Sequence, residues 1–498
     1  MAPVVLALDV GSTSAKAQYF DAWGRALTPP FRSRVAITPE GRADPEVFLA
    51  SVEAVVDAAL QPPAPVPDGV ALACAWHGLV GLGPDGRPTT PLSTWQAIGA
   101  GPAAAELCRR LPDPDAVRRR TGAPVHPSLP SSRLLWWSMH HPDAFRATTR
   151  WCSIGELLEG RWLEGAPGPS SSMASGTGCY DQEAAQWDPE VLGALGLAPG
   201  ALAPVDDEIR FGLAAPYRRR WPVLAGLPWL PAVGDGACSN VGTGCSGARA
   251  ALTVGTSAAV RVLADPEQRA GRPFGLFAYL VDPARVVLGA SRSNAGNLAE
   301  WAGRVLRVDA ALAASPDGLV EAVAARPPGS GGVVAEPSLA GERSPHWPLD
   351  ASGSWAGVRH STTALDLAQS LIEAAVLGLA DAVETLESHV GPCTLIASGR
   401  AVASSFGWRR LLADGLGRPI IPSRVEEATA RGAALVALER LGWLESSPLE
   451  AQDGDPVEPD AVRAQAFARL RTERQEQTAA GRQTVDGSRQ DHWSRTNP

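Results

Sequence analysis

The feature that most constrains the fold is a local design that occurs twice in the chain. The apolar run Val4–Leu8 enters the segment Asp9-Val-Gly-Ser-Thr-Ser-Ala-Lys16, and the apolar run Ala250–Val254 enters Gly255-Thr-Ser257. In both places a glycine is followed by hydroxyl residues and a second extended run leaves the turn, which predicts a β-hairpin. Two such hairpins predict a chain made of two similar halves.

The chemistry of these turns favours phosphate binding. Glycine lets the backbone approach a ligand closely, and neighbouring N–H and hydroxyl groups can then donate to phosphate oxygens. The residues concerned are Gly11, Ser12, Thr13 and Ser14 in the first turn, and Gly255, Thr256 and Ser257 in the second. We therefore expect a nucleotide to be clamped between the halves; two ordinary tight turns are the alternative.

Lys16 is the only lysine in the chain. A compact ammonium group suits a phosphate as a point charge, which an arginine reproduces imperfectly. A chance survivor of an arginine-rich codon usage is an equal alternative, so Lys16 only supports the phosphate interpretation.

Length and charge set the outer limits. A chain of 498 residues is long enough for two or more domains, and 45% hydrophobic residues describe a globular protein. A net charge of −9 argues against nucleic-acid and membrane-surface binding.

The N-terminus resembles no signal peptide, which predicts a cytoplasmic location. Seven scattered cysteines without a C-x-x-C pair argue against disulfides and structural zinc. The oligomeric state stays open, a homodimer included.

The order of expected elements supports a duplicated α/β domain. Three strands in a meander precede a helix and a buried strand, and the order then recurs in the second half. The expected strands are 4–8, 15–20, one after the turn at 21–24, 70–75, 250–254, 258–263, 277–281, 286–290 and 394–397. Helices are expected from Asp44 as N-cap, near Asn297 and over 365–386. From about 470 the composition turns polar, which predicts a disordered tail over 470–498.

Asp235 is the best candidate for chemistry. The apolar segment Trp229–Gly234 reads as a strand that delivers Asp235 to the point where the halves meet. A carboxylate beside a bound γ-phosphate can accept the proton of an attacking hydroxyl and can also hold hydrated Mg²⁺. The alternative is an aspartate that caps the helix beginning at Gly236.

These segments resemble the FGGY family of carbohydrate kinases, and within it the bacterial gluconate kinases. The resemblance covers roughly residues 3–445. Beyond the two hairpins it rests on the following segments: His77-Gly-Leu-Val-Gly81, Ser172-Met-Ala-Ser-Gly-Thr-Gly178, Val233-Gly-Asp-Gly-Ala237, Leu339-Ala-Gly-Glu-Arg-Ser-Pro345 and Leu411-Leu-Ala-Asp414. Each is weak alone, but their order and spacing are specific.

The resemblance implies an actin-like fold of two ribonuclease-H-like domains around a cleft. The N-terminal domain, residues 1–246, would bind the sugar, and the C-terminal domain, residues 247–450, would bind ATP. By motif, Asp235 matches the general base and Asp9 a carboxylate that helps to hold Mg²⁺. His77 and Gly78 fall in the sugar-contacting segment, and Gly399 falls beside the adenosine.

The chain departs from the family pattern at two places. The family usually has a Trp-x-Asp-x-Arg segment where this chain has Trp95-Gln-Ala-Ile-Gly99, so both charges are lost at the sugar site. Arg400 stands where a second glycine is typical, and its side chain either blocks the nucleotide or swings outward. A different polyol, a weakened sugar site or an inactive protein would follow.

The resemblance leaves three functions open. The leading one is an ATP-dependent kinase of a sugar or sugar acid, with gluconate favoured; a xylulose-type ketose kinase and a catalytically silent nucleotide-binding protein are the alternatives. Arg133 lies in a segment like that of the gluconate kinases, where it either pairs a sugar-acid carboxylate or is a surface arginine. Glu342 and Arg343 are either a surface ion pair or part of a loop near the cleft.

Overall fold

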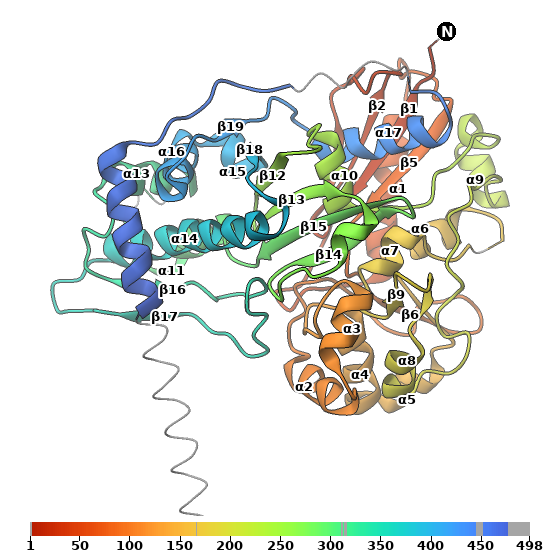
Figure 1. Cartoon of the computed structure of the whole chain (residues 1–498). Coiled ribbons are helices and arrows are strands. Elements are labelled where there is room, and N and C mark those ends of the chain that lie inside the picture. The colour runs from red at the N-terminus through yellow and green to blue at the C-terminus, as the bar shows by residue number, and fades with distance from the viewer. Residues whose placement is uncertain (1, 166, 310–311, 313–315, 445–451, 477–498) are drawn as a thin grey trace, which may run out of the picture.

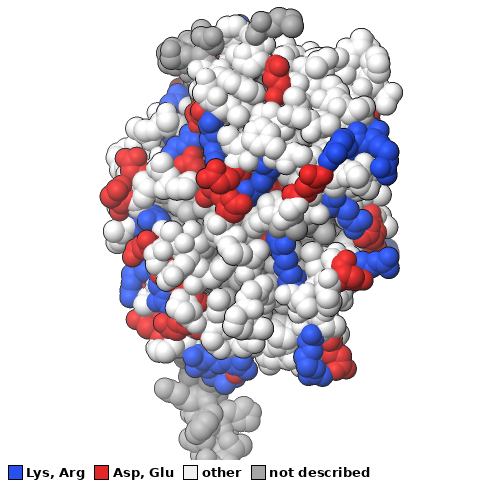
Figure 2. Space-filling view, turned by 90° about the vertical axis from the view of Figure 1, so that its right-hand side faces the viewer, with Lys and Arg blue, Asp and Glu red and all other residues white. Residues whose placement is uncertain are grey.

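The computed structural model describes residues 2–165, 167–309, 312, 316–444 and 452–476. Two β-sheets with helices packed on them form the two halves of the molecule, and a smaller helical lobe lies beside the first half (Figure 1). Figure 2 shows acidic and basic side chains interspersed over one face. None of the described helices is long and apolar enough to cross a membrane.

The first sheet has the order β11-β5-β1-β2-β3. β1 pairs antiparallel with β2 and parallel with β5, and Val10 lies opposite both Ala15 and Cys74. Every residue of β1 and β5 is buried, as expected for strands covered on both faces. The strands are β1 (Val5–Val10), β2 (Ser14–Phe20), β3 (Phe31–Arg34), β5 (Gly69–Cys74) and β11 (Val233–Gly234).

The second sheet repeats this topology, in the order β14-β15-β13-β12-β18-β19. β12 pairs antiparallel with β13 and parallel with β18, as β1 does with β2 and β5. β14 is an additional strand at the edge. The bounds are β12 (Arg249–Val254), β13 (Ala258–Ala264), β14 (Phe277–Asp282), β15 (Arg285–Arg292), β18 (Thr394–Ser398) and β19 (Ile421–Pro422). The expected duplicated α/β fold is confirmed.

Helices begin where the sequence predicts them. Asp44 caps α1 (Pro45–Ala59) by accepting from the N–H groups of Glu46 and Val47. In α14 (Ala364–Val390), Thr363 and Asp366 cap each other reciprocally. The predicted helix near Asn297 is α11 (Gly296–Val305).

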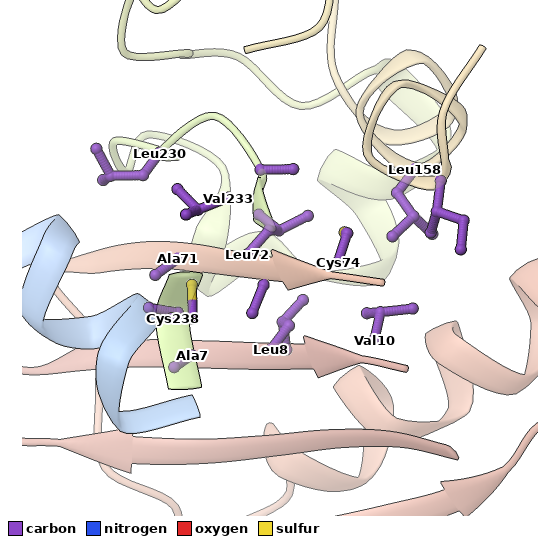
Figure 3. Packing of buried hydrophobic residues seen from close by; sticks show 14 of the residues in the cluster. Ala7, Leu8, Val10, Ala71, Leu72, Cys74, Leu158, Leu230, Val233 and Cys238 are labelled. Carbon is purple, nitrogen blue, oxygen red and sulfur yellow. The ribbon is translucent and has the colours of Figure 1, made fainter. Parts of the chain in front are cut away.

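Two helices from different halves of the chain cross in backbone contact. They are α10 (Asp235–Gly242) and α17 (Ala428–Arg440), and α17 also packs on β1 and β5. A Cβ atom at Gly432 would lie 1.8 Å from the Cys238 carbonyl oxygen, and one at Gly242 would lie 1.7 Å from that of Ala428. α17, which follows the second sheet in the chain, therefore completes the first core, in which Leu8, Leu72 and Cys238 also lie (Figure 3).

The smaller lobe has its own hydrophobic core around Leu107, Leu134 and Trp151. Its helices are α2 (Gly101–Arg110), α3 (Pro114–Thr121), α4 (Pro130–His140), α5 (Pro142–Ala147) and α8 (Pro189–Leu195). The remaining elements are β4 (Arg42–Ala43), β6 (Val80–Leu82), β7 (Leu92–Ser93), β8 (Arg150–Cys152), α6 (Ile154–Trp162), α7 (Ser171–Ser175), β9 (Tyr180–Asp181), β10 (Gln186–Trp187), α9 (Ala215–Arg220), η1 (Pro222–Leu224), η2 (Pro266–Arg269), α13 (Pro316–Ala325), β16 (Val334–Glu336), β17 (Ser354–Ala356), α15 (Arg400–Ser404) and α16 (Phe406–Leu416).

The structure corrects two expectations. The strand predicted over Trp229–Gly234 is regular only at Val233–Gly234, because Pro231 has no N–H for the ladder. Residues 470–476 of the tail predicted to be disordered instead end a helix that begins at 461, since Phe467 is buried and Arg471 pairs with Asp381 at 2.7 Å. The remaining predicted tail, 477–498, lies outside the described residues.

Candidate active site

A cavity of about 800 Å³ brings both predicted phosphate turns to one place. Thr13 of the first turn and Thr256 of the second lie on its wall. Trp95 and Arg133 line it from the first half, and Trp301 on α11 lines it from the second. Segments far apart in sequence therefore share one open space.

The two turns offer unused backbone donors. Gly11 N–H bonds the Ser14 carbonyl at 2.9 Å, and Gly255 N–H bonds the Ser257 carbonyl at 2.9 Å. Within the described part of the chain, no backbone acceptor is found for the N–H groups that follow, those of Ser12, Thr13, Thr256 and Ser257. Such convergent N–H groups bind anions.

Lys16 and Asp9 lie at the base of the first turn, on paired positions of β1 and β2. The Lys16 ammonium donates to Glu427 at 2.8 Å and to Asp9 at 3.4 Å, and Glu427 also pairs with Arg32. Burial raises the pKa of Asp9 to about 6; Lys16 opposes the rise, and the charges of Asp235 and Glu427 add to it. Lys16 is thus held by two carboxylates beside the turn.

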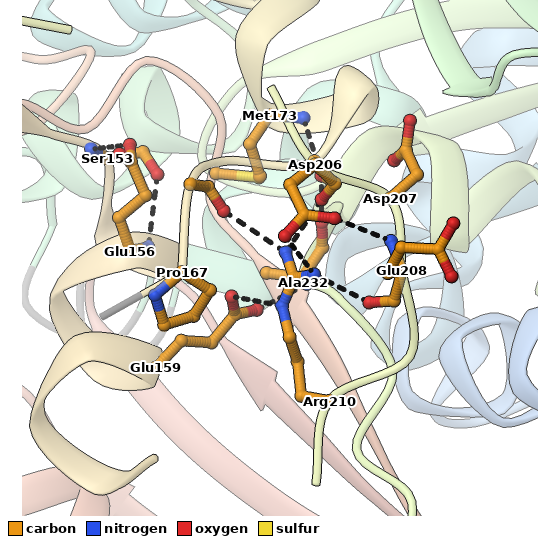
Figure 4. Close-up of polar contacts among 12 residues, drawn as sticks. Ser153, Glu156, Glu159, Pro167, Met173, Asp206, Asp207, Glu208, Arg210 and Ala232 are labelled. Atoms are coloured by element: carbon orange, nitrogen blue, oxygen red, sulfur yellow. Dashed lines mark hydrogen bonds and ion pairs between the residues drawn. The ribbon is translucent and has the colours of Figure 1, made fainter. Parts of the chain in front are cut away.

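A polar network fixes the segment that ends at Asp235 (Figure 4). The Ala232 N–H donates to Glu159 at 2.7 Å, and Arg210 lies 3.8 Å from the same carboxylate. The Gly234 N–H donates to the Ser172 hydroxyl at 3.0 Å. These bonds replace the strand pairing that Pro231 interrupts, so the position of Asp235 is set by side chains.

Asp235 is the first residue of α10, and its carboxylate is partly buried. It accepts from the Gly236 N–H at 2.8 Å and from the Trp76 N–H at 3.4 Å. Burial raises its pKa, against the lowering effects of the Arg261 charge, these two N–H groups and the Arg343 charge. Gly234, not Asp235, is the N-cap residue of α10, so the capping alternative does not describe this carboxylate. The Asp235 charge acts on Asp9, and the role of general base stays a prediction.

His77 follows β5 in the left-handed backbone region, with φ 66°. Its Nδ1 lies 2.6 Å from the Gly176 carbonyl, and its ring contacts Tyr279 edge-on at 5.4 Å. Burial lowers the pKa of His77 to about 3, so the ring is neutral at physiological pH and Nδ1 donates the proton. Gly78 is needed for packing, since a Cβ there would lie 2.5 Å from Ile154.

The segment that departs from the family pattern forms one wall of the cavity. Trp95, Ala97, Ile98 and Gly99 all line it. The Arg343 guanidinium stacks over the Trp95 ring at 4.9 Å, so a charge lies next to this wall, although Arg343 is not itself among the lining residues. Arg343 and Glu342 are both buried, which rules out the surface ion pair that the sequence left open.

The proposed role of Arg133 in binding a carboxylate needs correction. Arg133 is only 3% exposed, although it touches the cavity. Its Nη1 donates to the carbonyls of Ser93 and Thr94 at 2.9 Å, and its Nη2 donates to those of His77 and Ser128. The guanidinium donors are used by the backbone, so Arg133 holds these loops together and is not free for a ligand.

Gly399 lies where β18 ends, with φ 93°. A Cβ atom there would lie 2.5 Å from the Val254 carbonyl, so only glycine lets the two parallel strands end side by side. Arg400 begins α15 and its side chain is exposed.

Arg261 on β13 is a charged residue of the site that belongs to none of the sequence motifs. It lies within the run Ala258-Ala-Val-Arg-Val-Leu-Ala264, where a single arginine among apolar residues was the available signal. Its charge acts directly on Asp235. Asn297 and Glu300 on α11 also line the cavity and were missed, because only the fold brings this helix to the turns.

Comparisons with known proteins agree with this arrangement. Residues 4–242 match the N-terminal domain of the FGGY family of carbohydrate kinases, and residues 250–439 match its C-terminal domain. The chain is 26% identical to a gluconokinase of Bacillus licheniformis, over 90% of the chain and 89% of the relative. It is 29% identical to a xylulose kinase of Streptomyces rubiginosus, over 87% of each. The fold superposes on a gluconate kinase from Lactobacillus acidophilus with TM-score 0.83 and 24% identity, covering 96% and 98% of the two chains.

Proposed function

Since the chain belongs to the FGGY family of carbohydrate kinases, we propose that it transfers the γ-phosphoryl group of ATP to a hydroxyl of a sugar or sugar acid, gluconate being the favoured acceptor. The observation that carries this proposal is the meeting of two turns with free N–H groups at one cavity. Asp235 supports it, because this carboxylate of the first half interacts with the Arg261 charge of the second half. The gluconokinase relatives support the choice of acceptor.

The residues suit in-line phosphoryl transfer. Asp235 would accept the proton of the attacking hydroxyl, and its position at the end of a rigid network keeps the acceptor oriented. The N–H groups of Thr13, Thr256 and their neighbours would stabilise charge on the phosphate oxygens. Closure of the halves would exclude water, which otherwise would take the phosphoryl group in place of the sugar.

Asp9 and Asp235 fit a hydrated Mg²⁺ ion. Burial raises the pKa of Asp9 and the charge of Asp235 adds to the rise, so the two carboxylates lie close enough to interact, beside the Lys16 ammonium that donates to Asp9. No group of three or more ligating side chains occurs among the residues described, which suits an ion that keeps waters and substrate phosphates as its other ligands. When bound there, Mg²⁺ would supply charge neutralisation of the phosphates.

The acceptor is tested with a panel of gluconate, xylulose and glycerol in a coupled assay of ADP release. We expect gluconate to be preferred in kcat/KM by at least about tenfold, a difference of roughly 1.4 kcal/mol. A preference for xylulose would establish the ketose-kinase alternative. ATP binding without turnover of any acceptor would establish the silent homologue.

Gly255→Val tests the second phosphate turn. A Cβ at Gly255 meets only the Ser257 carbonyl, at 3.9 Å, so the fold should survive. The β-branched side chain would occupy the approach of phosphate, and we expect ATP affinity to fall at least about tenfold. Calorimetric titration with MgATP measures it, and Gly226→Val, at an open surface position, is the matched control. Unchanged affinity would reduce this segment to an ordinary turn.

Arg400 distinguishes a kinase from a silent homologue. Because its side chain is exposed, we expect the wild type to bind MgATP in the range usual for enzymes, about 1 μM to 1 mM. Arg400→Gly should then change affinity by less than about threefold, since outward rotamers are open to this side chain. The contrary result is a wild type without measurable binding whose affinity appears only in Arg400→Gly.

A further inference from the structure

The Arg261 guanidinium lacks the partners that a buried cation needs. Its Nε and Nη1 are buried and have no hydrogen-bond partner within the described residues. A Cβ at Gly236 would lie 3.2 Å from Nε, so the guanidinium packs against the first turn of α10, next to Asp235. Burial lowers the pKa of Arg261 to about 10, which still leaves it charged at neutral pH. Buried guanidinium nitrogens without a hydrogen-bond partner are costly, so their presence points to a ligand.

Arg343 is a second arginine with unused capacity beside Asp235. Its hydrogen bonds, from Nε to the Ser293 hydroxyl and from Nη2 to the Arg292 carbonyl, are both 3.3 Å long. The adjacent Glu342 carboxylate is occupied by Arg292 at 2.9 Å and by the Ser293 N–H at 2.9 Å. No ion pair to Arg343 is found in the part of the chain that the structure describes.

Charge counting gives the nature of the missing ligand. Asp235 carries one negative charge when ionised, and the Arg261 and Arg343 charges both act on it. One further negative charge would balance the three groups. A carboxylate is a suitable match, because guanidinium groups bind it through paired N–H donors.

The position of the two arginines favours an anion on the acceptor over the phosphates of ATP. Arg261 lies four residues beyond Ser257, roughly 13 Å along β13 from the turn that would hold phosphate. Arg343 stacks on Trp95, which lines the cavity, although neither arginine is itself among the lining residues. Arg261 therefore lies away from the second phosphate turn, and Arg343 lies next to the wall that carries the Trp95 segment.

We propose that Arg261 and Arg343 bind the carboxylate of a sugar acid and thereby select acids over neutral polyols. This inference rests on the proposed kinase function, because that function is what identifies the region beside Asp235 as the place where the acceptor binds. Both arginines come from the second half, whereas His77 and Asp235 belong to the first, so a carboxylate held here also ties the two halves together around the acceptor.

The test compares gluconate with glucitol, a polyol of the same carbon chain without the carboxylate. Calorimetric titrations without ATP are made on the wild type, Arg261→Gln, Arg343→Gln and Arg219→Gln, the last an exposed arginine outside the site. We expect each site variant to bind gluconate at least about tenfold more weakly while the affinity for glucitol changes less than about threefold. Arg219→Gln should match the wild type for both ligands.

A second measurement, of thermal unfolding, separates a role of Arg261 in binding from a role in stability. Because the buried Nε and Nη1 of Arg261 have no hydrogen-bond partner among the described residues, Arg261→Met should raise the thermal unfolding midpoint of the ligand-free protein and remove the further rise that gluconate gives the wild type. A lower midpoint without gluconate would assign Arg261 to the structure and overturn the proposal. Equal weakening of gluconate and glucitol would overturn it as well.

Failure of this inference is distinct from failure of the proposed function. Gluconate binding that needs Arg261, in a protein that phosphorylates no acceptor, would keep the carboxylate site and reject the kinase. Phosphorylation of xylulose or glycerol by a protein that ignores the carboxylate would do the reverse.

Discussion

Asp235→Asn is expected to lower turnover at least about 100-fold while the affinity for MgATP stays within a few-fold of the wild type. The amide keeps the size of the side chain and can still accept from the Gly236 and Trp76 N–H groups, but it cannot take a proton. A 100-fold loss corresponds to about 2.7 kcal/mol of transition-state stabilisation. Single-turnover kinetics and calorimetry measure the two quantities separately.

The same variant should not lose stability. Burial raises the pKa of Asp235, which means that the folded protein disfavours the ionised carboxylate, so a neutral amide removes that cost. Asp85→Asn, at an exposed loop, is the matched control for both measurements. Turnover within a few-fold of the wild type would take the role of general base away from Asp235.

Gly432→Ala is expected to lower the free energy of unfolding by about 3 kcal/mol or more. The new Cβ would lie 1.8 Å from the Cys238 carbonyl oxygen, so α10 and α17 must move apart along their contact. Overpacking against a side chain usually costs about 1–3 kcal/mol, and a backbone atom yields less readily. Urea unfolding followed by circular dichroism measures the change.

The same substitution at another helical glycine should have the opposite sign. Gly193 in α8 has open space around its Cβ position, so Gly193→Ala should stabilise by roughly 0.5–1 kcal/mol through helix propensity. If both variants had equal stability, the close approach of α10 and α17 would not be needed for the fold.

The sequence predicted the strands and caps because those signals are local. The apolar runs of β1 and β12 and the Asp44 cap act within a few residues, and each element lies within a few residues of its expected range. The helix over 461–476 was missed because its composition is polar, and its order comes from the buried Phe467 and from ion pairs to α14.

The site was predictable in its chemistry and less so in its contacts. Asp235 and the two turns carry motifs, and the structure brings both turns to one cavity. The saturation of Arg133 by backbone carbonyls and the isolation of Arg261 depend on loops and strands far apart in the chain. No local pattern encodes which guanidinium finds its partners.

The return of α17 to the first half has a consequence for synthesis of the chain. Domains of a nascent protein usually fold as units, the N-terminal one first. Here β1, β5 and α10 leave the ribosome without the helix that covers them, and they must wait until the second half has been translated. We therefore expect the nascent first half to expose apolar surface throughout that interval and to depend on chaperones, and we expect an isolated N-terminal fragment to aggregate unless α17 is supplied.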